Sequence, residues 1–286
     1  MLNLAKRNLT LYFRQRSAVF FSLLSVLIII GLYLVFLGDI WKSDLQGLPG
    51  VDILMNSWLI AGIVAVTSIT TAMGVFGIMV EDRVRKVSKD FYASPLRRVS
   101  LLGGYVLSAY LVGLGLSLLA FALGEGYLVC IGGSLLPFPD LLRVLGILLV
   151  SGFLCSSFVF FLVSFFSSNS AFTTASTVLG TLIGFVTGIY LPLGSLPEAV
   201  QWGIKLFPVS HAAALLRQVL LKAPMAESFS GAPAEVAELF SQSMGVTFTF
   251  GQTELTPALH LLILAGTGVL FFLLALWNVS RKKRAL

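Results

Sequence analysis

Six long apolar runs, separated by shorter polar segments, dominate the pattern of the chain. The runs cover residues 17–38, 57–80, 101–123, 144–166, 171–191 and 258–279, and none of them contains Asp, Glu, Lys or Arg. Each run is long enough to cross roughly 30 Å of hydrocarbon as an α-helix that rises about 1.5 Å per residue. Because the runs are continuous rather than alternating, we expect helices and not a β-barrel. The pattern predicts an all-α membrane protein, a single transmembrane domain of six transmembrane helices over residues 1–286.

The polar segments predict further short helices. In residues 1–16, an apolar stripe that includes Ala5 and Tyr12 lies opposite Arg7 and Arg14. This pattern predicts an interfacial helix whose cations face anionic headgroups. Residues 192–257 are predicted to be external. Their first half is too apolar for an ordinary loop and is interrupted by Pro208, which predicts two short re-entrant outer helices. Their second half predicts an exposed loop with a short helix at 234–243.

Charge is sparse and strongly segregated along the chain. The sequence is 57% hydrophobic and 11% charged, whereas about a quarter of an ordinary soluble domain is charged. Of the 19 Lys and Arg residues, four lie in residues 1–16, six in 81–100 and four in 281–284. Basic residues accumulate on the cytoplasmic side of membrane proteins, which predicts that both termini are cytoplasmic. The excess of basic residues behind the net charge of +6 is therefore explained by their position on the cytoplasmic side of the membrane, and we expect no nucleic acid partner.

The basic segment between the second and third runs has two interpretations. Val84, Val87 and Phe91 share one helical stripe, which predicts a short amphipathic helix at 82–93 that ends before Pro95. The segment is either an ordinary cytoplasmic loop that obeys the charge bias or a docking element for a cytoplasmic partner.

Small and hydroxylated residues repeat along one face of the second and of the fifth run. In the second run these are Thr67, Thr70, Thr71 and Gly74; in the fifth they are Thr173, Thr177, Gly180, Thr181, Gly184 and Gly188. Small residues let helix backbones approach closely in lipid. The two faces therefore either pack within one subunit, or meet a second subunit or line a substrate path.

The chain carries no recognisable catalytic motif. It has no G-x-x-x-x-G-K-[ST] phosphate loop, no H-E-x-x-H and no nucleophile elbow. Cys130 and Cys155 predict neither a disulfide framework nor a metal site. His211 and His260 lack metal-ligand spacing, and each is interpreted as a lone polar residue near an interface. We expect no metal and no cofactor in this chain, and no enzymatic activity of its own.

In order along the chain, three stretches resemble the membrane subunit of an ABC-2-type exporter. They are LAKRNLTLYFRQRSAVFF before the first run, EDRVRKVSKDFYASPLRRVSLLGGYVLSAYLVG after the second, and YLPLGSLPEAVQWGIKLFPVSHAAALLRQ after the fifth. Glu81 and the Ser94–Arg97 turn occupy places where this family commonly has an acidic residue and a Ser-Pro-Leu-Arg-like turn. One departure is Phe207, where the family often has Asn.

The resemblance implies a bacterial plasma-membrane permease that works with other subunits. A cytoplasmic ABC ATPase would hold ATP and Mg, and a second permease subunit would complete a homodimer or a heterodimer in the lipid membrane. The residues that it assigns to ATPase coupling are Glu81, Asp82, Arg83, Arg85, Lys86, Lys89, Phe91 and Arg97. The small-residue faces of the second and fifth runs would then flank an export path, and Pro197 and Pro208 would belong to an outer gate.

Two other function classes compete with this interpretation. A stand-alone secondary transporter or channel would need buried ionisable groups for ion coupling, which the six runs lack. An intramembrane enzyme would need acid-base residues or metal ligands there, and only His260 is ionisable. The uncharged runs favour an ATP-driven exporter of an amphipathic substrate such as a drug, lipid-like toxin, peptide or glycolipid.

Overall fold

The computed structural model describes residues 1–32, 45, 47–87, 98–251 and 253–281 as a helical bundle. Its longest elements are α4 (Val51–Val84), α6 (Arg98–Cys130), α7 (Phe138–Val163) and α13 (Pro257–Arg281). Shorter helices are α1 (Leu2–Arg14), α2 (Arg16–Leu32), α8 (Asn169–Val186), α9 (Glu198–Leu206), α10 (Pro208–Leu220), α11 (Lys222–Ser228) and α12 (Ala234–Ser243), with a 3-10 turn, η2, at Leu193–Ser195. Strands β1 (Thr249–Phe250) and β2 (Thr253–Glu254) form a small antiparallel pair. The predicted all-α architecture is confirmed apart from this pair.

Four of the described helices are long and apolar enough to cross a membrane. They are α4, α6 from Ser100 onward, α7 and α13. The other two predicted spans coincide with α2 and α8, but residues 33–38 lie outside the described residues and α8 ends at Val186, before the predicted end at residue 191. The six-span arrangement therefore stays a prediction.

Helix α4 occupies the centre of the molecule. In its most apolar stretch 89% of residues are buried inside the chain, against 22% in α13, which lies at the outside of the bundle. Helices α2, α6, α7, α8 and α10 all pack against α4. At 34 residues α4 is about 51 Å long, so it extends beyond the hydrocarbon of a bilayer at one or both ends. With α6, which has 33 residues, it is one of the two longest elements of the described core.

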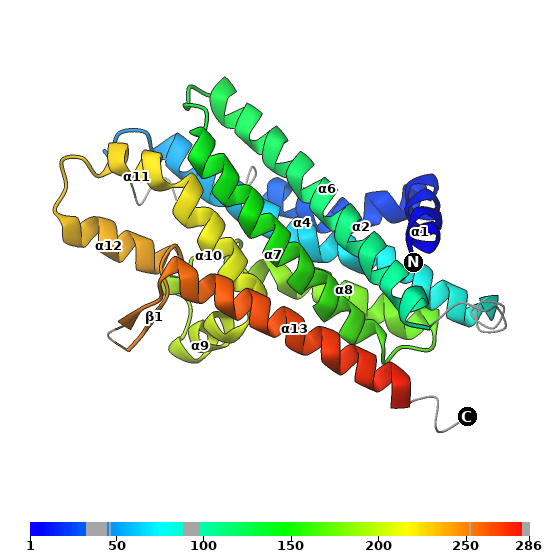
Figure 1. The fold of residues 1–286 in the computed structure, drawn as a ribbon. Helices are drawn as coiled ribbons and strands as arrows, with labels where there is room; N and C mark the ends of the chain where they lie inside the picture. The colour runs from blue at the N-terminus through cyan, green and yellow to red at the C-terminus, as the bar shows by residue number, and fades with distance from the viewer. Residues whose placement is uncertain (33–44, 46, 88–97, 252, 282–286) are drawn as a thin grey trace.

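The two ends of the bundle differ in character. Figure 1 shows the N-terminus and α1 at one end, and α9, α11, α12 and β1 at the other. The short helix predicted at 234–243 is α12, and the two helices predicted around Pro208 are α9 and α10. We call the two ends the α1 end and the α12 end.

Small residues bring α6 close to α4 along much of its length. A methyl group on Gly124 would lie 2.5 Å from Ile60 Cγ2, and one on Gly113 would lie 3.3 Å from the Ser68 carbonyl oxygen. Between these points Ser68 Oγ and Ser117 Oγ share a hydrogen bond of 2.8 Å. This is the close helix approach with cross-helix hydroxyl bonding that small residues permit in lipid.

Candidate functional site

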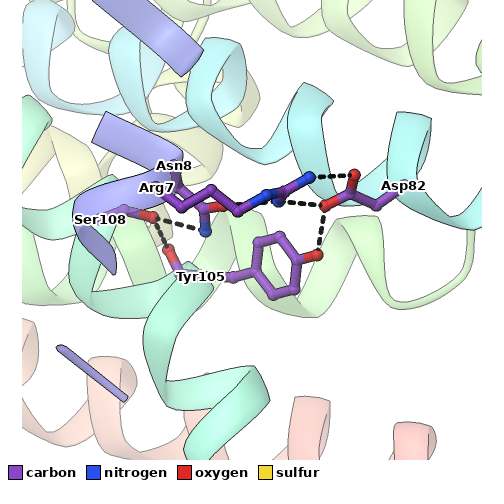
Figure 2. Close-up of polar contacts among 5 residues, drawn as sticks. All are labelled: Arg7, Asn8, Asp82, Tyr105 and Ser108. Carbon is purple, nitrogen blue, oxygen red and sulfur yellow. Dashed lines mark hydrogen bonds and ion pairs between the residues drawn. The ribbon is translucent and has the colours of Figure 1, made fainter. Parts of the chain in front are cut away.

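A buried polar network joins α1, α4 and α6 at the α1 end. Arg7 donates from Nη1 to Asp82 Oδ2 at 2.7 Å and from Nη2 to Asp82 Oδ1 at 2.9 Å. Tyr105 donates its hydroxyl to Asp82 Oδ2 at 2.5 Å. Figure 2 shows the guanidinium and the carboxylate face to face, with the Tyr105 hydroxyl at the same oxygen. A forked arginine–carboxylate pair fixes orientation as well as charge, so α1 is held in one register against α4.

The network continues from Arg7 through its neighbour in α1. Arg7 Nη1 also donates to Asn8 Oδ1 at 3.1 Å, and Asn8 Nδ2 donates to Ser108 Oγ at 3.3 Å. Ser108 Oγ in turn donates to the Tyr105 carbonyl oxygen at 2.8 Å. Asn8 and Ser108 are fully buried, so these bonds satisfy polar groups that water does not reach. Sequence analysis did not identify Asn8, Tyr105 and Ser108 as part of a site. The available signals were the polar Asn8 on the inward side of α1 and the polar Tyr105 and Ser108 within an apolar run.

Adjacent glycines in α6 create the seat for α1. A methyl group on Gly104 would lie 2.7 Å from Leu4 Cδ2 and 3.0 Å from Leu4 Cβ, and one on Gly103 would lie 3.0 Å from Met1 Sδ. The face of α1 that packs inward contains Ala5, Asn8 and Tyr12. The expectation that Arg7 faces lipid headgroups is wrong, because its guanidinium pairs with the carboxylate of Asp82 in α4.

Burial and pairing act in opposite directions on the Arg7 charge, and the pairing with Asp82 dominates. The Asp82 side chain is 8% exposed and that of Arg7 is 33% exposed. The hydrogen bond with Asp82 is the main reason that the pKa of Arg7 is raised above its ordinary value. Because the Asp82 carboxylate is buried, replacing either partner would leave the charge of the other poorly solvated.

The other residues assigned to coupling spread around the end of α4. Glu81 and Arg85 form an exposed ion pair of 2.6 Å. Arg83 donates to the carbonyl oxygens of Val163 at 2.9 Å and Phe166 at 3.0 Å, which binds α4 to the end of α7. Lys86 is exposed. Lys89, Phe91 and Arg97 lie outside the described residues.

The structure ends α4 later than the sequence suggests. Residues 82–84, predicted to begin a separate helix, are the last turn of α4, which is capped at Arg85. Lys86 then takes a left-handed conformation with φ of 61°, which directs the chain away from the helix axis. Asp82 is consequently a residue of the central helix itself and not of a detached loop helix. The second half of the predicted helix at 82–93, residues 88–93, lies outside the described residues.

The hydroxyl face predicted on the second span is buried within this chain. Thr67, Thr70 and Thr71 are at most 7% exposed, and their hydroxyls donate to carbonyl oxygens three or four residues earlier in α4. Gly74 is half-buried on the same helix. For α4 the structure therefore favours packing within one subunit over a face that meets a second subunit.

Helix α8 has the opposite arrangement. Thr173, Thr177 and Thr181 are exposed along one side of it, and Gly180 is half-buried. Gly184 lies against the Tyr190 ring, where a methyl group would be 2.3 Å from a ring carbon. Gly188 does not continue the stripe, because α8 ends at Val186 and Gly188 takes the left-handed position of its C-terminal cap with φ of 67°. The exposed threonine face is unpartnered within the described residues.

The two prolines assigned to the outer gate each begin a helix. Pro197 caps the N-terminus of α9, and Pro208 is the first residue of α10. A proline fits the first turn of a helix because its missing N–H has no helical partner there. The break at Phe207 between α9 and α10 follows from this spacing.

A buried arginine that sequence reasoning missed fixes the α12 end. Arg217 of α10 donates to the carbonyl oxygens of Thr187, Gly188 and Gly245 at 3.1–3.3 Å, and its guanidinium lies 4.7 Å from the centre of the Trp58 ring. No carboxylate among the described residues pairs with it. The carbonyls at the end of α8 carry the negative end of the helix dipole, which compensates part of the charge. The available signal was Arg217 as the one residue of α10 with a fixed charge.

His211 and His260 are partners, contrary to the expectation that each is isolated. Their Nδ1 atoms are 2.8 Å apart, and both rings are buried beside Phe248. His211 also forms a hydrogen bond with the backbone of Lys205. If His211 uses its own proton there, its Nδ1 is free to accept, so we assign the shared proton to His260 Nδ1, which donates to His211 Nδ1. Among the described residues no group of three or more His, Cys, Asp or Glu side chains could hold a metal ion.

Comparison with known protein families gives one clear match. The family model described as ABC-2 family transporter protein matches residues 42–277, which is most of the chain. No curated protein matches the sequence. The matched range includes α4, α6, α7, α8 and nearly all of α13, but not the α1 half of the polar network.

Proposed function

The chain belongs to the ABC-2 transporter family and is an ABC transporter permease, and we propose that it is the membrane subunit of an ATP-driven exporter. A separate cytoplasmic ATPase supplies the energy, since this sequence contains no phosphate loop. A second permease subunit, identical or related, completes the assembly. Two conformations of the membrane helices, biased by nucleotide on the partner, then move an amphipathic molecule outward.

The observation that carries this proposal is the polar network under α1. It binds α1, α4 and α6 to one another immediately before the basic segment at 85–98. Because Asp82 belongs to the central helix, a displacement of this segment or of α1 acts directly on α4. Because a buried ion pair has strict geometry, the helices that it joins move together. A movement of α1 or of the basic segment is therefore transmitted to α4.

The second permease has a candidate surface on α8. The exposed threonines Thr173, Thr177 and Thr181 form an uncharged face with small side chains. Two such faces across a subunit boundary provide hydroxyls without fixed charge, which suits an amphipathic substrate better than an inorganic ion. This supports a path between subunits that is bordered by α8, with α4 acting as the internal support.

The test is recovery of the ATPase with charge-reversed variants. We expect the tagged chain, extracted in mild detergent, to retain a soluble protein that bears a phosphate loop. Lys86→Glu combined with Lys89→Glu should lose that protein, because both charges change in the predicted docking segment. Lys222→Glu at the α12 end is the matched control and should keep it. Retention of the ATPase by the double variant would contradict the placement of the coupling segment.

A further inference from the structure

A two-part groove lies at the α12 end, between α12 and the η2 turn. The larger part has a volume of about 570 Å³ and the smaller about 280 Å³, and the two parts share Gly194, Leu239 and Ser243. We call them the apolar compartment and the polar compartment. Ligand sites in proteins span roughly 300 to 1,000 Å³, so together the compartments have the size of a small-molecule site.

The apolar compartment is lined mainly by large hydrophobic side chains. Six of them are Met55, Phe229, Val236, Leu239, Phe240 and Met244. Leu239 is 66% exposed and Val236 43% exposed, although both lie on the side of α12 that borders the groove. Exposed apolar surface beside a hollow is costly in water, and an apolar ligand would cover it. Because this compartment is a single hollow, it suits one hydrocarbon chain.

The polar compartment differs sharply in chemistry. Gln201, Gln242, Thr247 and Thr249 line it together with Lys205. The Lys205 ammonium donates to the Thr249 carbonyl oxygen at 3.0 Å, and no carboxylate of the described residues forms an ion pair with it. Glu238 accepts a bond from the Gln242 amide at 3.3 Å but is not among the residues that line either part. The fixed charge inside the groove is therefore positive.

The boundary between the compartments is a tight helix contact. A methyl group on Gly194 would lie 2.7 Å from Ser243 Oγ and 3.0 Å from Ser243 Cα. Only a glycine lets α12 come this close to η2, so the contact sets the width of the groove. Figure 1 shows α12 at the end of the bundle away from α1. Met55 lies two residues before the predicted start of the second span, so the groove opens beside the outer membrane boundary.

From this juxtaposition we propose that the groove binds an anionic single-chain amphiphile, with its acid group at Lys205 and its chain in the apolar compartment. The occupant is the exported molecule as it leaves the membrane, so the inference rests on the proposed function for the source of the ligand. An apolar chain and an anionic head match the two linings, and a ligand with no charge or with a cationic head would forgo the Lys205 contact.

The test is photo-labelling of the complex in nanodiscs with a diazirine fatty acid and with its methyl ester. We expect the acid to label peptides of α12 and η2 more strongly than the lipid-facing helix α13, which serves as internal control. Lys205→Gln should weaken labelling by the acid about fivefold and leave the ester unchanged. Leu239→Glu should weaken labelling by both about tenfold. Matched controls are Lys222→Gln and Leu206→Glu, neither of which lines the groove.

Three outcomes would overturn the proposal. They are labelling no stronger at the groove than along α13, equal labelling by acid and ester in the wild type, and labelling of the groove by a photoactivatable two-chain phospholipid instead of the single-chain acid. The same preparation is examined for bound ATPase. Absence of groove labelling with the ATPase still bound defeats only this inference. Groove labelling without any ATPase defeats the proposed function and leaves the site itself supported.

Discussion

Arg7 and Asp82 illustrate how much one residue pair can decide at the residue scale. The two side chains belong to α1 and α4, which are far apart in the sequence, and they form an ion pair. Tyr105 occupies one Asp82 oxygen in addition. A pair with this geometry resists substitution from either side, because the partner left behind is buried and charged.

Loss of the Arg7 charge should therefore destabilise the protein measurably. In Arg7→Gln the Asp82 carboxylate keeps Tyr105 but loses its cation, and breaking a buried pair costs about 3–5 kcal/mol. Since Arg7 is one-third exposed, we expect about 3 kcal/mol. Thermal unfolding in detergent measures it, with Arg14→Gln on the exposed side of α1 as control. The double variant Arg7→Gln/Asp82→Asn should lose less than the two single variants together. Strict additivity would mean that the pair is not coupled.

The histidine pair predicts a pH dependence at the α12 end. Burial lowers the pKa of His211 from 6.5 to about 4. Between these values the unfolded chain binds the proton and the folded chain does not, so stability is full above pH 6.5 and falls as the pH drops toward 4. The full shift corresponds to about 3 kcal/mol.

Unfolding midpoints of the wild type and His211→Gln, measured from pH 7.5 down to 4.5, isolate this contribution from that of the carboxylates. Glutamine accepts the His260 proton but does not titrate, so the variant should lose less stability on acidification. Equal losses in the two proteins would show that His211 is not held neutral.

At the scale of elements, glycine positions decide which helices touch. Gly104 and Gly115 both belong to α6 and face different surroundings: a methyl group on Gly104 would overlap Leu4 of α1, whereas one on Gly115 meets nothing within 4 Å. Alanine is favoured over glycine in a helix by about 1 kcal/mol. The same substitution should therefore have opposite signs at the two positions.

We expect Gly104→Ala to lower the unfolding temperature and to increase proteolysis of residues 1–16, because α1 is pushed from its seat. Gly115→Ala should leave proteolysis unchanged and raise the unfolding temperature slightly. If both variants behave alike, α1 does not depend on close contact with α6. The experiment also tests the network indirectly, since Arg7 reaches Asp82 only when α1 is seated.

At the scale of the whole molecule, the chain has a buried polar network at one end and a groove at the other. The Arg7–Asp82–Tyr105 network lies at the α1 end, and the groove beside Met55 lies at the α12 end. Helix α4 contributes to both, through Asp82 near its C-terminus and Met55 near its N-terminus. A rigid central helix that contacts both ends is a physical route by which an event at one could bias the other.

The sequence by itself determined the helical class, the approximate positions of four long apolar helices and the family resemblance. These properties depend only on residues that are close together in the sequence. The free energy of transferring about twenty apolar residues into lipid is set by those residues alone, and a proline or glycine affects only its own turn. The ends of α13 and α12 agree closely with expectation for this reason. The short stretches that carried the resemblance are also local.

Only the tertiary structure decided which polar residues meet and which faces are covered. Arg7 and Asp82 are 75 positions apart and His211 and His260 are 49 apart, so no local pattern connects them. Likewise Thr67 and Thr177 occupy similar small-residue faces, yet one is buried and the other exposed. In lipid every outward face is equally apolar, so hydrophobicity does not report which side of a helix packs; close approach at glycines and pairing of the few polar groups make that choice.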